Sequence, residues 1–280
     1  GPGEWETSPG GLVTALSPML RERGGGWVGW DGSTARKAPP SFEHENIRIR
    51  PVSMSKGEFE NFYAGFSNKT LWPLYHDSIR EPHFHRRWWW PYVKVNERFA
   101  DATAEVAKPG DLVWVHDYQL QLVPGMVRER VPNAKIGFFL HIPFPPEELF
   151  AKIPWRQQIL ESMLGADVVG FQTRLAAQNF SRSARRFTEA TGSDTTLKFQ
   201  GRKVHVGAFP ISIDVDLYEG MARDPQIAVE AERFRAGYAG RRIILCVDRL
   251  DYTKGIDIRL KAFEELLSRG RYTAEDCVLV

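Results

Sequence analysis

Short apolar runs recur along this chain, and each is followed by polar residues and then by a stretch with helical spacing. Three of these runs lie at 111–115, 136–140 and 167–171. Continuous apolar runs of this length are typical of parallel strands that crossover helices bury on both faces. The repeated pattern therefore predicts an α/β protein built on a doubly wound parallel sheet.

Capping residues, prolines and apolar spacing predict where further helices and strands begin and end. Thr173 is a suitable N-cap for a helix that runs to Arg186. Pro18 predicts a kink near Ser17 or a late start of the first helix, because proline disrupts a helix interior. The other predicted elements are strands at 203–209, 242–247 and 277–280, and helices at 119–130, 225–236 and 256–268.

Two domains are expected, joined at the segment 211–214. Residues 1–212 are predicted to form an N-terminal Rossmann-like domain, and residues 213–280 the beginning of a C-terminal one. Only about 66 residues follow Asp214, fewer than the roughly 100 of a typical doubly wound domain, so we expect the second domain to be truncated. No strand pattern precedes Gly10, so the first strand of the N-terminal domain is expected to be absent.

Composition narrows the class of protein and its partners. With 280 residues, 42% hydrophobic and 26% charged, the chain has the make-up of a soluble globular protein. A formal charge of +2 gives no reason to expect a nucleic-acid partner. Only Cys246 and Cys277 occur, which favours a reducing, cytoplasmic location over a disulfide framework or a cysteine metal site. No apolar stretch is long enough to predict a membrane partner.

Polar residues follow the predicted strands at the edge where open parallel sheets bind their ligands. Asp117 follows the run at 111–115, and His141 follows the run at 136–140. We interpret both as candidate site residues. Two alternatives stay open, because Asp117 is also suited to capping the next helix, and His141 to a structural role in the core.

Two cations follow the predicted strand at 242–247. Arg249 and Lys254 suit an anionic ligand, and Gly255 allows a tight turn behind them. The alternative is that they pair with neighbouring aspartates of the same loop, Asp248, Asp251 and Asp257. Gly10 and Gly11 resemble a phosphate-approaching turn before a helix, although paired glycines also mark ordinary turns.

Aromatic residues are abundant in the first half of the chain. Tyr63, Trp72 and the run Trp88–Trp90 are either packing residues or a surface on which sugar rings stack. No pair of carboxylates has spacing that identifies a glycosidase, and no zinc, EF-hand, P-loop lysine or G-x-S-x-G motif is present. Metal-dependent and serine-nucleophile chemistry are therefore disfavoured.

Taken in order, the motifs of the chain resemble those of the trehalose-6-phosphate synthase family. The two longest are FFLHIPFP at 138–145 and RLDYTKG at 249–255. The shorter ones are GGL at 10–12, WVGW at 27–30, FSN at 66–68, LWP at 71–73, VHDY at 115–118 and GFQT at 170–173. The series covers nearly the whole chain.

This resemblance implies a retaining glycosyltransferase of family 20 with the GT-B arrangement of two Rossmann-like domains. Such an enzyme moves glucose from a nucleotide sugar, usually UDP-glucose, to glucose 6-phosphate and releases UDP and α,α-trehalose 6-phosphate. The first domain would bind the acceptor and the second the nucleotide sugar. Alternatives are another GT-B glycosyltransferase, such as a glycogen-synthase relative, or a non-catalytic homologue that senses sugar phosphates.

The resemblance also implies roles for individual residues. Tyr63, Trp72 and Asp117 match acceptor-binding positions, and Asp117 and His141 are the implied catalytic residues. The implied donor-binding residues are Gly10, Gly11, His141, Arg249 and Lys254. In the family's front-face mechanism, the histidine would hydrogen-bond the transferring sugar while the aspartate orients the acceptor hydroxyls.

No cofactor and no metal are expected, because fixed arginine and lysine groups can stabilise the departing diphosphate and UDP-glucose is a substrate. The expected partners are the nucleotide sugar and glucose 6-phosphate, and a homo-oligomer is left open. The family's opening strand, which carries an arginine, has no counterpart before Gly10, and its acidic loop lies downstream of Val280. The chain alone is therefore expected to bind substrates and catalyse poorly.

Overall fold

The computed structural model of the chain describes residues 11–35 and 37–280. Two compact units make up the molecule: unit 1 comprises Gly1–Ile211 and unit 2 comprises Ser212–Val280. The boundary between them in the sequence lies between residues 211 and 212, inside the segment 211–214 where a link between two domains is predicted. Each unit has its own sheet and helices.

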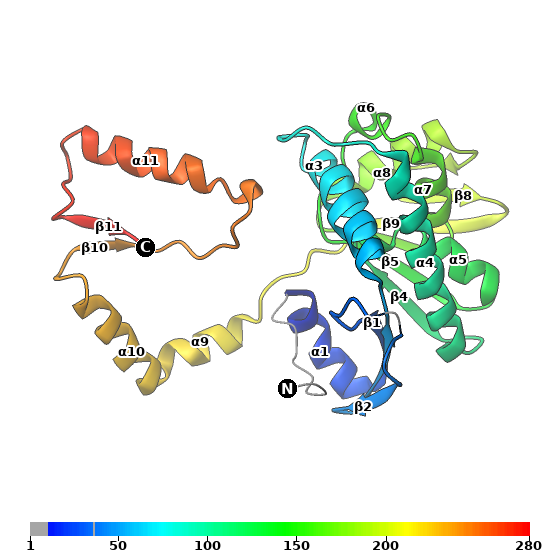
Figure 1. Cartoon of the computed structure of the whole chain (residues 1–280), viewed down its shortest axis with the longest axis horizontal. Coiled ribbons are helices and arrows are strands. Elements are labelled where there is room, and N and C mark those ends of the chain that lie inside the picture. Colours follow the sequence, from blue (N-terminus) through cyan, green and yellow to red (C-terminus); the bar gives the residue numbers. More distant parts are fainter. Residues whose placement is uncertain (1–10, 36) are drawn as a thin grey trace. The chain divides into compact units, whose positions relative to one another are not determined.

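A parallel sheet lies at the centre of unit 1 (Figure 1). Its strand order is β4-β5-β6-β9-β8-β7, and the first four strands are parallel. The strands are β4 (Leu112–His116), β5 (Lys135–Leu140), β6 (Val168–Phe171), β7 (Thr191–Gly192), β8 (Thr196–Phe199) and β9 (Arg202–Ala208). The predicted parallel α/β sheet is therefore confirmed, whereas the antiparallel pair β7 and β8 at its edge was not predicted.

Helices between these strands pack against one face of the sheet. They are α5 (Val123–Arg130), the short α6 (Glu147–Phe150), α7 (Arg156–Met163) and α8 (Arg174–Phe187). Helix α8 begins as predicted, because the Thr173 hydroxyl accepts a hydrogen bond from the Ala176 N–H at 3.2 Å. Helix α5 begins four residues later than the predicted 119, because Tyr118–Leu120 form a separate 3₁₀ turn, η2.

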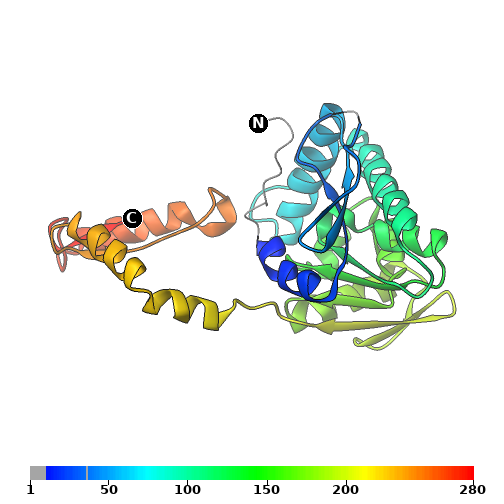
Figure 2. The same ribbon diagram turned by 90° about the horizontal axis from the view of Figure 1, so that it is seen from below.

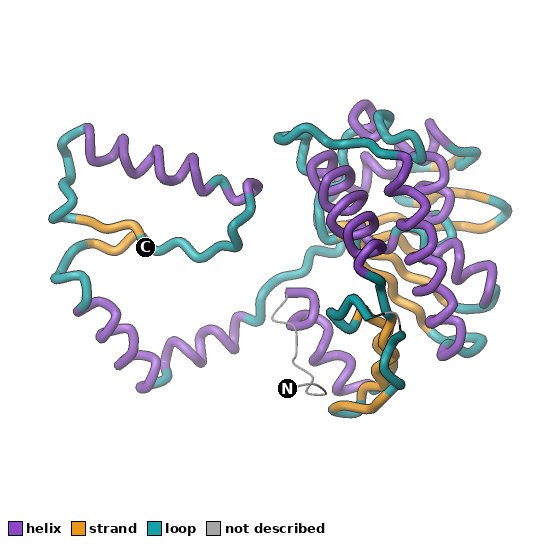
Figure 3. Tube along the Cα trace, in the orientation of Figure 1, coloured by secondary structure: helices purple, strands orange, loops and turns teal. Residues whose placement is uncertain are grey.

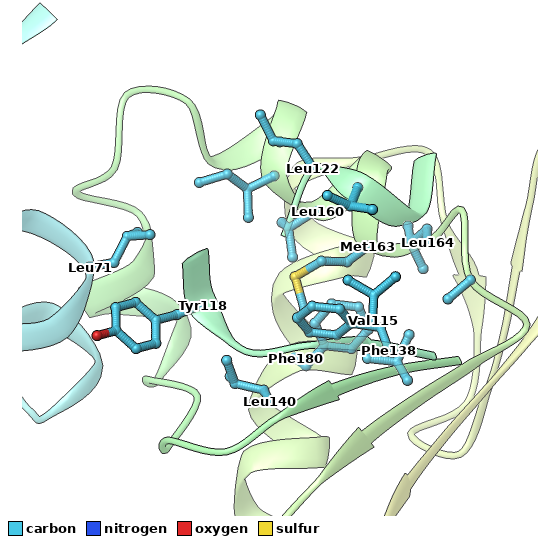
Figure 4. Packing of buried hydrophobic residues seen from close by; sticks show 14 of the residues in the cluster. Leu71, Val115, Tyr118, Leu122, Phe138, Leu140, Leu160, Met163, Leu164 and Phe180 are labelled. Carbon is cyan, nitrogen blue, oxygen red and sulfur yellow. The ribbon is translucent and has the colours of Figure 1, made fainter. Parts of the chain in front are cut away.

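The hydrophobic core of unit 1 lies between this helical layer and the sheet (Figure 4). Val115, Phe138 and Leu140 point from β4 and β5 toward Met163 of α7 and Phe180 of α8, and each is at most 5% exposed. These strand residues alternate in sequence with residues of the opposite face, as the two-residue repeat of a strand requires. One face of the sheet is therefore committed to the core.

Strand β4 is less buried than its apolar sequence predicts. Leu112 is 72% exposed and Trp114 is 41% exposed, so the prediction that this run is buried on both faces is wrong. The physical reason is its position, because β4 is an edge strand of its sheet. Trp114 also lies on the face opposite to Val115, away from the helices of the core.

A second, three-stranded sheet precedes β4 in the chain. It consists of β1 (Gly25–Trp30), β2 (Phe42–His44) and β3 (Ile47–Val52) in the order β1-β3-β2, with β1 parallel to β3. Helix α1 (Gly11–Arg23) contacts β1 and continues through Pro18, so the predicted late start of this helix is wrong (Figure 2). In the described residues, β1 is the first strand.

Four helical segments connect the two sheets of unit 1: α2 (Lys56–Glu58), the π-helix η1 (Phe59–Leu71), α3 (Trp72–Tyr75) and α4 (Arg86–Val106). A capping box starts the series, in which the Ser55 hydroxyl accepts from the Glu58 N–H and the Glu58 carboxylate accepts from the Ser55 N–H. In α4, Trp88 and Trp89 are buried whereas Trp90 is 66% exposed. Core packing is therefore the correct interpretation for the first two tryptophans.

Unit 2 is a β-α-β segment preceded by two helices (Figure 3). Its elements are α9 (Val215–Arg223), α10 (Pro225–Ala236), β10 (Arg242–Ile244), the 3₁₀ turn η3 (Tyr252–Lys254), α11 (Ile256–Ser268) and β11 (Cys277–Leu279). Helix α9 was not predicted, whereas α10 and α11 have the predicted bounds. Strand β10 ends at Ile244, three residues earlier than predicted, and Val247 is 84% exposed because only β11 pairs with β10 in the described part of the unit.

Candidate active site

Asp117 and His141 are brought together at the carboxyl edge of the sheet in unit 1. Strand β4 ends at His116 and β5 ends at Leu140, so the two residues follow neighbouring parallel strands. The Asp117 N–H donates to the Phe139 carbonyl at 2.8 Å. In return, the Asp117 carboxylate accepts the His141 backbone N–H at 3.2 Å. Hydrogen bonds therefore join the two predicted catalytic residues at the ends of two neighbouring strands.

The backbone of Asp117 has an unusual conformation. Its φ of 72° and ψ of 171° lie in a region that essentially only glycine adopts without strain. Strain of this kind costs about 1–3 kcal/mol and is found mostly at functional sites. The Asp117 side chain gives no capping hydrogen bond to the 3₁₀ turn that follows it, so the simple helix-cap interpretation is not supported.

The strain at Asp117 predicts that Asp117→Gly is more stable than Asp117→Ala. Both variants lose the bond to the His141 N–H, but only glycine relieves the strained φ. Relief of about 1–3 kcal/mol exceeds the roughly 0.4–1 kcal/mol that glycine costs through unfolded-chain entropy. Urea unfolding followed by tryptophan fluorescence measures this, because all nine tryptophans precede residue 212 and report on unit 1. An alanine variant as stable as the glycine variant would contradict the observed backbone.

A second histidine completes the group. Nδ1 of His116 lies 3.0 Å from Nε2 of His141, and the two ring centroids are 5.3 Å apart. Burial and, to a smaller extent, the nearby His141 together lower the pKa of His116 to about 4. Burial also lowers the pKa of His141 to about 4. Both imidazoles are therefore neutral at pH 7.

The carboxyl group of Asp117 is shifted in the opposite sense. Burial raises its pKa to about 6, while the backbone N–H groups of His141 and Tyr118 lower it and so limit the rise. Asp117 is consequently ionised at pH 7 but takes up a proton only slightly below neutrality. A group with this pKa beside two neutral imidazoles can accept hydrogen bonds from ligand hydroxyls and exchange a proton.

Lowering the pH from 6.5 to 5 is expected to destabilise unit 1. At pH 5 the folded unit holds two neutral histidines and a protonated Asp117, whereas the unfolded chain holds two imidazolium groups and a carboxylate. The histidine contribution is complete above pH 6.5 and is lost as the pH falls toward 4. The Asp117 contribution is complete below pH 3.8 and is lost as the pH rises toward 6, so it opposes the first effect. Unfolding at pH 5 takes up two protons and releases one. The free energy of unfolding therefore decreases as the pH decreases.

Urea midpoints at pH 5, 6 and 7 measure this dependence. His116→Asn removes one of the two protons taken up on unfolding, so its midpoint should change less with pH than that of the unaltered chain. His205→Asn, which removes a histidine at an exposed position of β9, is the matched control with which the slope of the His116 variant is compared. An unchanged slope in the His116 variant would show that this ring does not titrate as described.

Trp72 contacts the residue that follows Asp117. Its indole contacts the Tyr118 ring at 5.5 Å between centroids and the His76 ring at 4.2 Å. The Tyr118 hydroxyl donates to Asn68 Oδ1 at 2.8 Å, which ties the π-helix to the end of β4. Trp72 and Asp117 are therefore connected through Tyr118, which the sequence marks only as part of the motif VHDY at 115–118, with no role of its own.

Tyr63 belongs to a separate aromatic cluster. Its ring stacks on Phe59 at 5.3 Å and contacts Trp30 of β1 at 6.2 Å. In the sequence, Trp30 stands out only as part of the motif WVGW at 27–30. The contact with Tyr63 makes it a candidate binding residue, and its place at the end of a strand was the signal that could have found it. The structure gives no contact that joins Tyr63 to Asp117 or His141.

One hollow of unit 1 does not contain the predicted residues. It has a volume of about 540 Å³ and lies between β1, β4 and helix α4. Trp114 and Val115 contribute to its lining, but Tyr63, Trp72, Asp117 and His141 do not. The candidate site is therefore the hydrogen-bonded group at the ends of β4 and β5, and this hollow is separate from it.

The predicted cations of unit 2 lie on the loop between β10 and α11. Asp251 caps the turn η3, accepting from the Thr253 N–H at 2.9 Å, and Asp248 pairs with Arg259 of α11 at 2.6 Å. Gly255 has a φ of 59°, so the tight turn expected behind Lys254 is present. Of the three aspartates proposed as alternative partners, two thus have other structural roles. Arg249 also has an interaction within the chain.

The glycine turn is only partly described. Gly11 is the first residue of helix α1, and Gly10 lies outside the described residues. No group of three histidine, cysteine, aspartate or glutamate side chains that could hold a metal occurs within 11–35 and 37–280. Both cysteines are free thiols. In the same residues, none of the helices combines the length and apolar character needed to cross a membrane.

The fold and the polar group at its sheet edge define a Rossmann-like α/β protein, a class that binds ligands beyond the carboxyl ends of parallel strands. A family model described as glycosyltransferase family 20 matches residues 2–280. A trehalose-6-phosphate synthase from Mycobacterium sp. (strain KMS) is 51% identical, and the match covers 99% of this chain and 58% of that protein. The relative from Mycolicibacterium smegmatis is 50% identical, with 57% of its length covered. The chain belongs to glycosyltransferase family 20.

Solved structures give the same result. A UDP-forming α,α-trehalose-phosphate synthase from Burkholderia xenovorans has a TM-score of 0.86 at 35% identity, and covers 98% of this chain. A protein from E. coli, solved with UDP-2-fluoro glucose, has a TM-score of 0.87 at 30% identity. The match covers 62% of each of these two chains. The predicted fold class, with Rossmann-like units of the GT-B type, is thereby confirmed, and this chain spans about three fifths of the length of its relatives.

Proposed function

We propose that the protein is a retaining glucosyltransferase that moves glucose from UDP-glucose to glucose 6-phosphate and forms α,α-trehalose 6-phosphate and UDP. The observation that carries this proposal is the strained Asp117 bonded to His141 at the sheet edge of a family 20 chain. The names of the relatives support the reaction. Solved neighbours hold UDP-2-fluoro glucose in one case and glucose 6-phosphate in another, which supports the two substrates.

In this proposal, unit 1 binds the acceptor. Tyr63 and Trp72 would contact the sugar ring of glucose 6-phosphate, because aromatic faces pack well against the C–H groups of a pyranose. The Asp117 carboxylate would accept hydrogen bonds from the acceptor hydroxyls and hold the attacking oxygen in place. Its ionised form, required for this role, predominates above pH 6.

Unit 2 would bind the nucleotide sugar. Arg249 and Lys254 would stabilise the negative charge that develops on the diphosphate as the glycosidic bond breaks. Gly10 and Gly11, which precede unit 2 in the chain, are the other proposed donor-binding residues. His141 would hydrogen-bond the transferring glucose while neutral, as its lowered pKa favours. Trehalose biosynthesis in the cytoplasm would follow as the physiological role.

An assay with both substrates tests the reaction. The protein, extended to the length of its relatives, is incubated with UDP-glucose and either glucose 6-phosphate or a glucan primer, and the products are separated. Formation of trehalose 6-phosphate and UDP supports the proposal. Growth of the glucan without trehalose 6-phosphate would identify another GT-B transferase, and binding of glucose 6-phosphate without turnover would identify a sensing homologue.

Chelation is expected to leave this activity unchanged. The proposed mechanism uses Arg249 and Lys254 in place of a metal ion to balance the charge of the diphosphate. Turnover should therefore remain within about twofold after dialysis against EDTA, and added Mg²⁺ should not raise it further. A loss of activity that Mg²⁺ restores would contradict the proposed role of the two cations.

A further inference from the structure

The pairing of His116 with His141 has consequences for which nitrogen of each ring carries the proton. At pH 7 each neutral imidazole has one N–H, so it donates through one nitrogen and accepts through the other. The 3.0 Å contact joins Nδ1 of His116 to Nε2 of His141. One of these two atoms must donate and the other accept, and the tautomer of one ring therefore dictates the tautomer of the other.

The intrinsic preference of histidine decides the direction. A neutral imidazole side chain in solution carries its proton mainly on Nε2. If both rings follow this preference, His141 donates through Nε2–H and His116 accepts through Nδ1. The opposite direction would require the less favourable Nδ1–H form in both rings. His141 is then left with Nδ1 as an acceptor for a hydroxyl group of a ligand.

Packing holds both rings in the positions that this bond needs. Trp114 contacts the His116 ring at 4.6 Å, and Phe139 contacts the His141 ring at 4.7 Å. Trp114 and His116 are two residues apart in one strand, and Phe139 precedes His141 by two in the next, so four rings share one face of the sheet. The Asp117 carboxylate fixes the backbone of His141 at the same time.

We propose that His116 is a positioning residue, which holds the ring of His141 in one orientation and one tautomer through the hydrogen bond between His116 Nδ1 and His141 Nε2. This role does not require His116 itself to contact a substrate. The kinetic consequence rests on the proposed function. The structural consequence does not, because the tautomer can be measured without any substrate.

Two substitutions of His116 separate positioning from simple packing. In His116→Asn, the amide Oδ1 can take the place of Nδ1 and accept the same bond. In His116→Phe, a ring of similar size remains but the acceptor is lost. The exposed His205 of β9 provides the control, replaced by phenylalanine and by asparagine in the same way.

The first readout is the ¹⁵N spectrum of the histidine rings in the 280-residue chain at pH 7. We expect the Nε2–H form of His141, with an exchange-protected proton, in the unaltered chain and in His116→Asn. In His116→Phe that protection should be lost and the two tautomers should interconvert. An Nδ1–H tautomer in the unaltered chain, or an unchanged His141 signal in His116→Phe, would overturn the proposal.

The second readout is turnover in the protein extended to the length of its relatives. We expect His116→Phe to lower kcat by about 10–100-fold, with KM for glucose 6-phosphate changed less than about threefold, since a misdirected ring acts on the transition state. His116→Asn should recover most of the loss. Equal losses in both variants, with folded circular dichroism spectra, would assign His116 to packing alone. If no variant and no parent turns over, the proposed function fails while the tautomer measurement still decides this inference.

Discussion

Replacing Arg249 or Lys254 with alanine is expected to lower kcat/KM for UDP-glucose by about 10²–10³-fold. In the proposed reaction these two cations lie against the diphosphate, where negative charge increases as the bond to glucose breaks. A fixed cation in such a position is worth more in the transition state than in the bound substrate, so kcat should fall together with kcat/KM. Steady-state assays at saturating glucose 6-phosphate measure both constants.

Arg269→Ala is the matched control for this experiment. Arg269 follows α11 in the same unit and pairs with Glu265, so its removal changes the charge of unit 2 by the same amount far along the chain from the loop. Its kcat/KM should stay within about twofold of the parent. If Arg249→Ala and Lys254→Ala behave like this control, the diphosphate role of the loop is wrong.

The largest effect on stability is expected at Trp89. Its ring stacks on Trp155 with centroids 4.9 Å apart and planes inclined by 6°, and only 7% of the residue is exposed. Truncation of a buried tryptophan to alanine removes buried apolar area and leaves a cavity, which costs about 3–5 kcal/mol. Trp89→Ala should lower the free energy of unfolding of unit 1 by this amount, as measured by urea unfolding.

The adjacent Trp90 offers a control of the same residue type in the same helix. Because Trp90 is 66% exposed, Trp90→Ala should change the free energy of unfolding by no more than about 0.5 kcal/mol. Similar losses in the two variants would mean that α4 is oriented differently from the structure. Circular dichroism at low temperature shows whether either variant has lost its fold.

Asp117 and His141 illustrate how the fold and the site depend on each other. The register of β4 and β5 places His116 beside Phe139, and this brings the residues after each strand within hydrogen-bonding distance. The positive φ of Asp117 then turns its carboxylate back toward the His141 N–H. A one-residue shift in the register of β4 and β5 would separate the side chains of His116, Asp117 and His141.

Local sequence signals predicted much of the backbone correctly. The N-cap at Thr173, the bounds of α10 and α11 and the tight turn at Gly255 all follow from residues that act on their neighbours in the chain. Apolar runs located β5 and β6 for the same reason. Motifs along the chain also identified the family, since they combine residue types in a fixed order.

Other features were missing from the prediction because they depend on which segments lie next to one another. The exposure of Trp114 depends on β4 being an edge strand of its sheet. The bond between His116 and His141 and the contact of Trp30 with Tyr63 join side chains from separate elements. Amino-acid order sets the local conformation and the chemistry available at each position, whereas strand register and helix packing set distances between side chains. Hydrogen bonds and pKa shifts depend on those distances, so they emerged only with the folded arrangement.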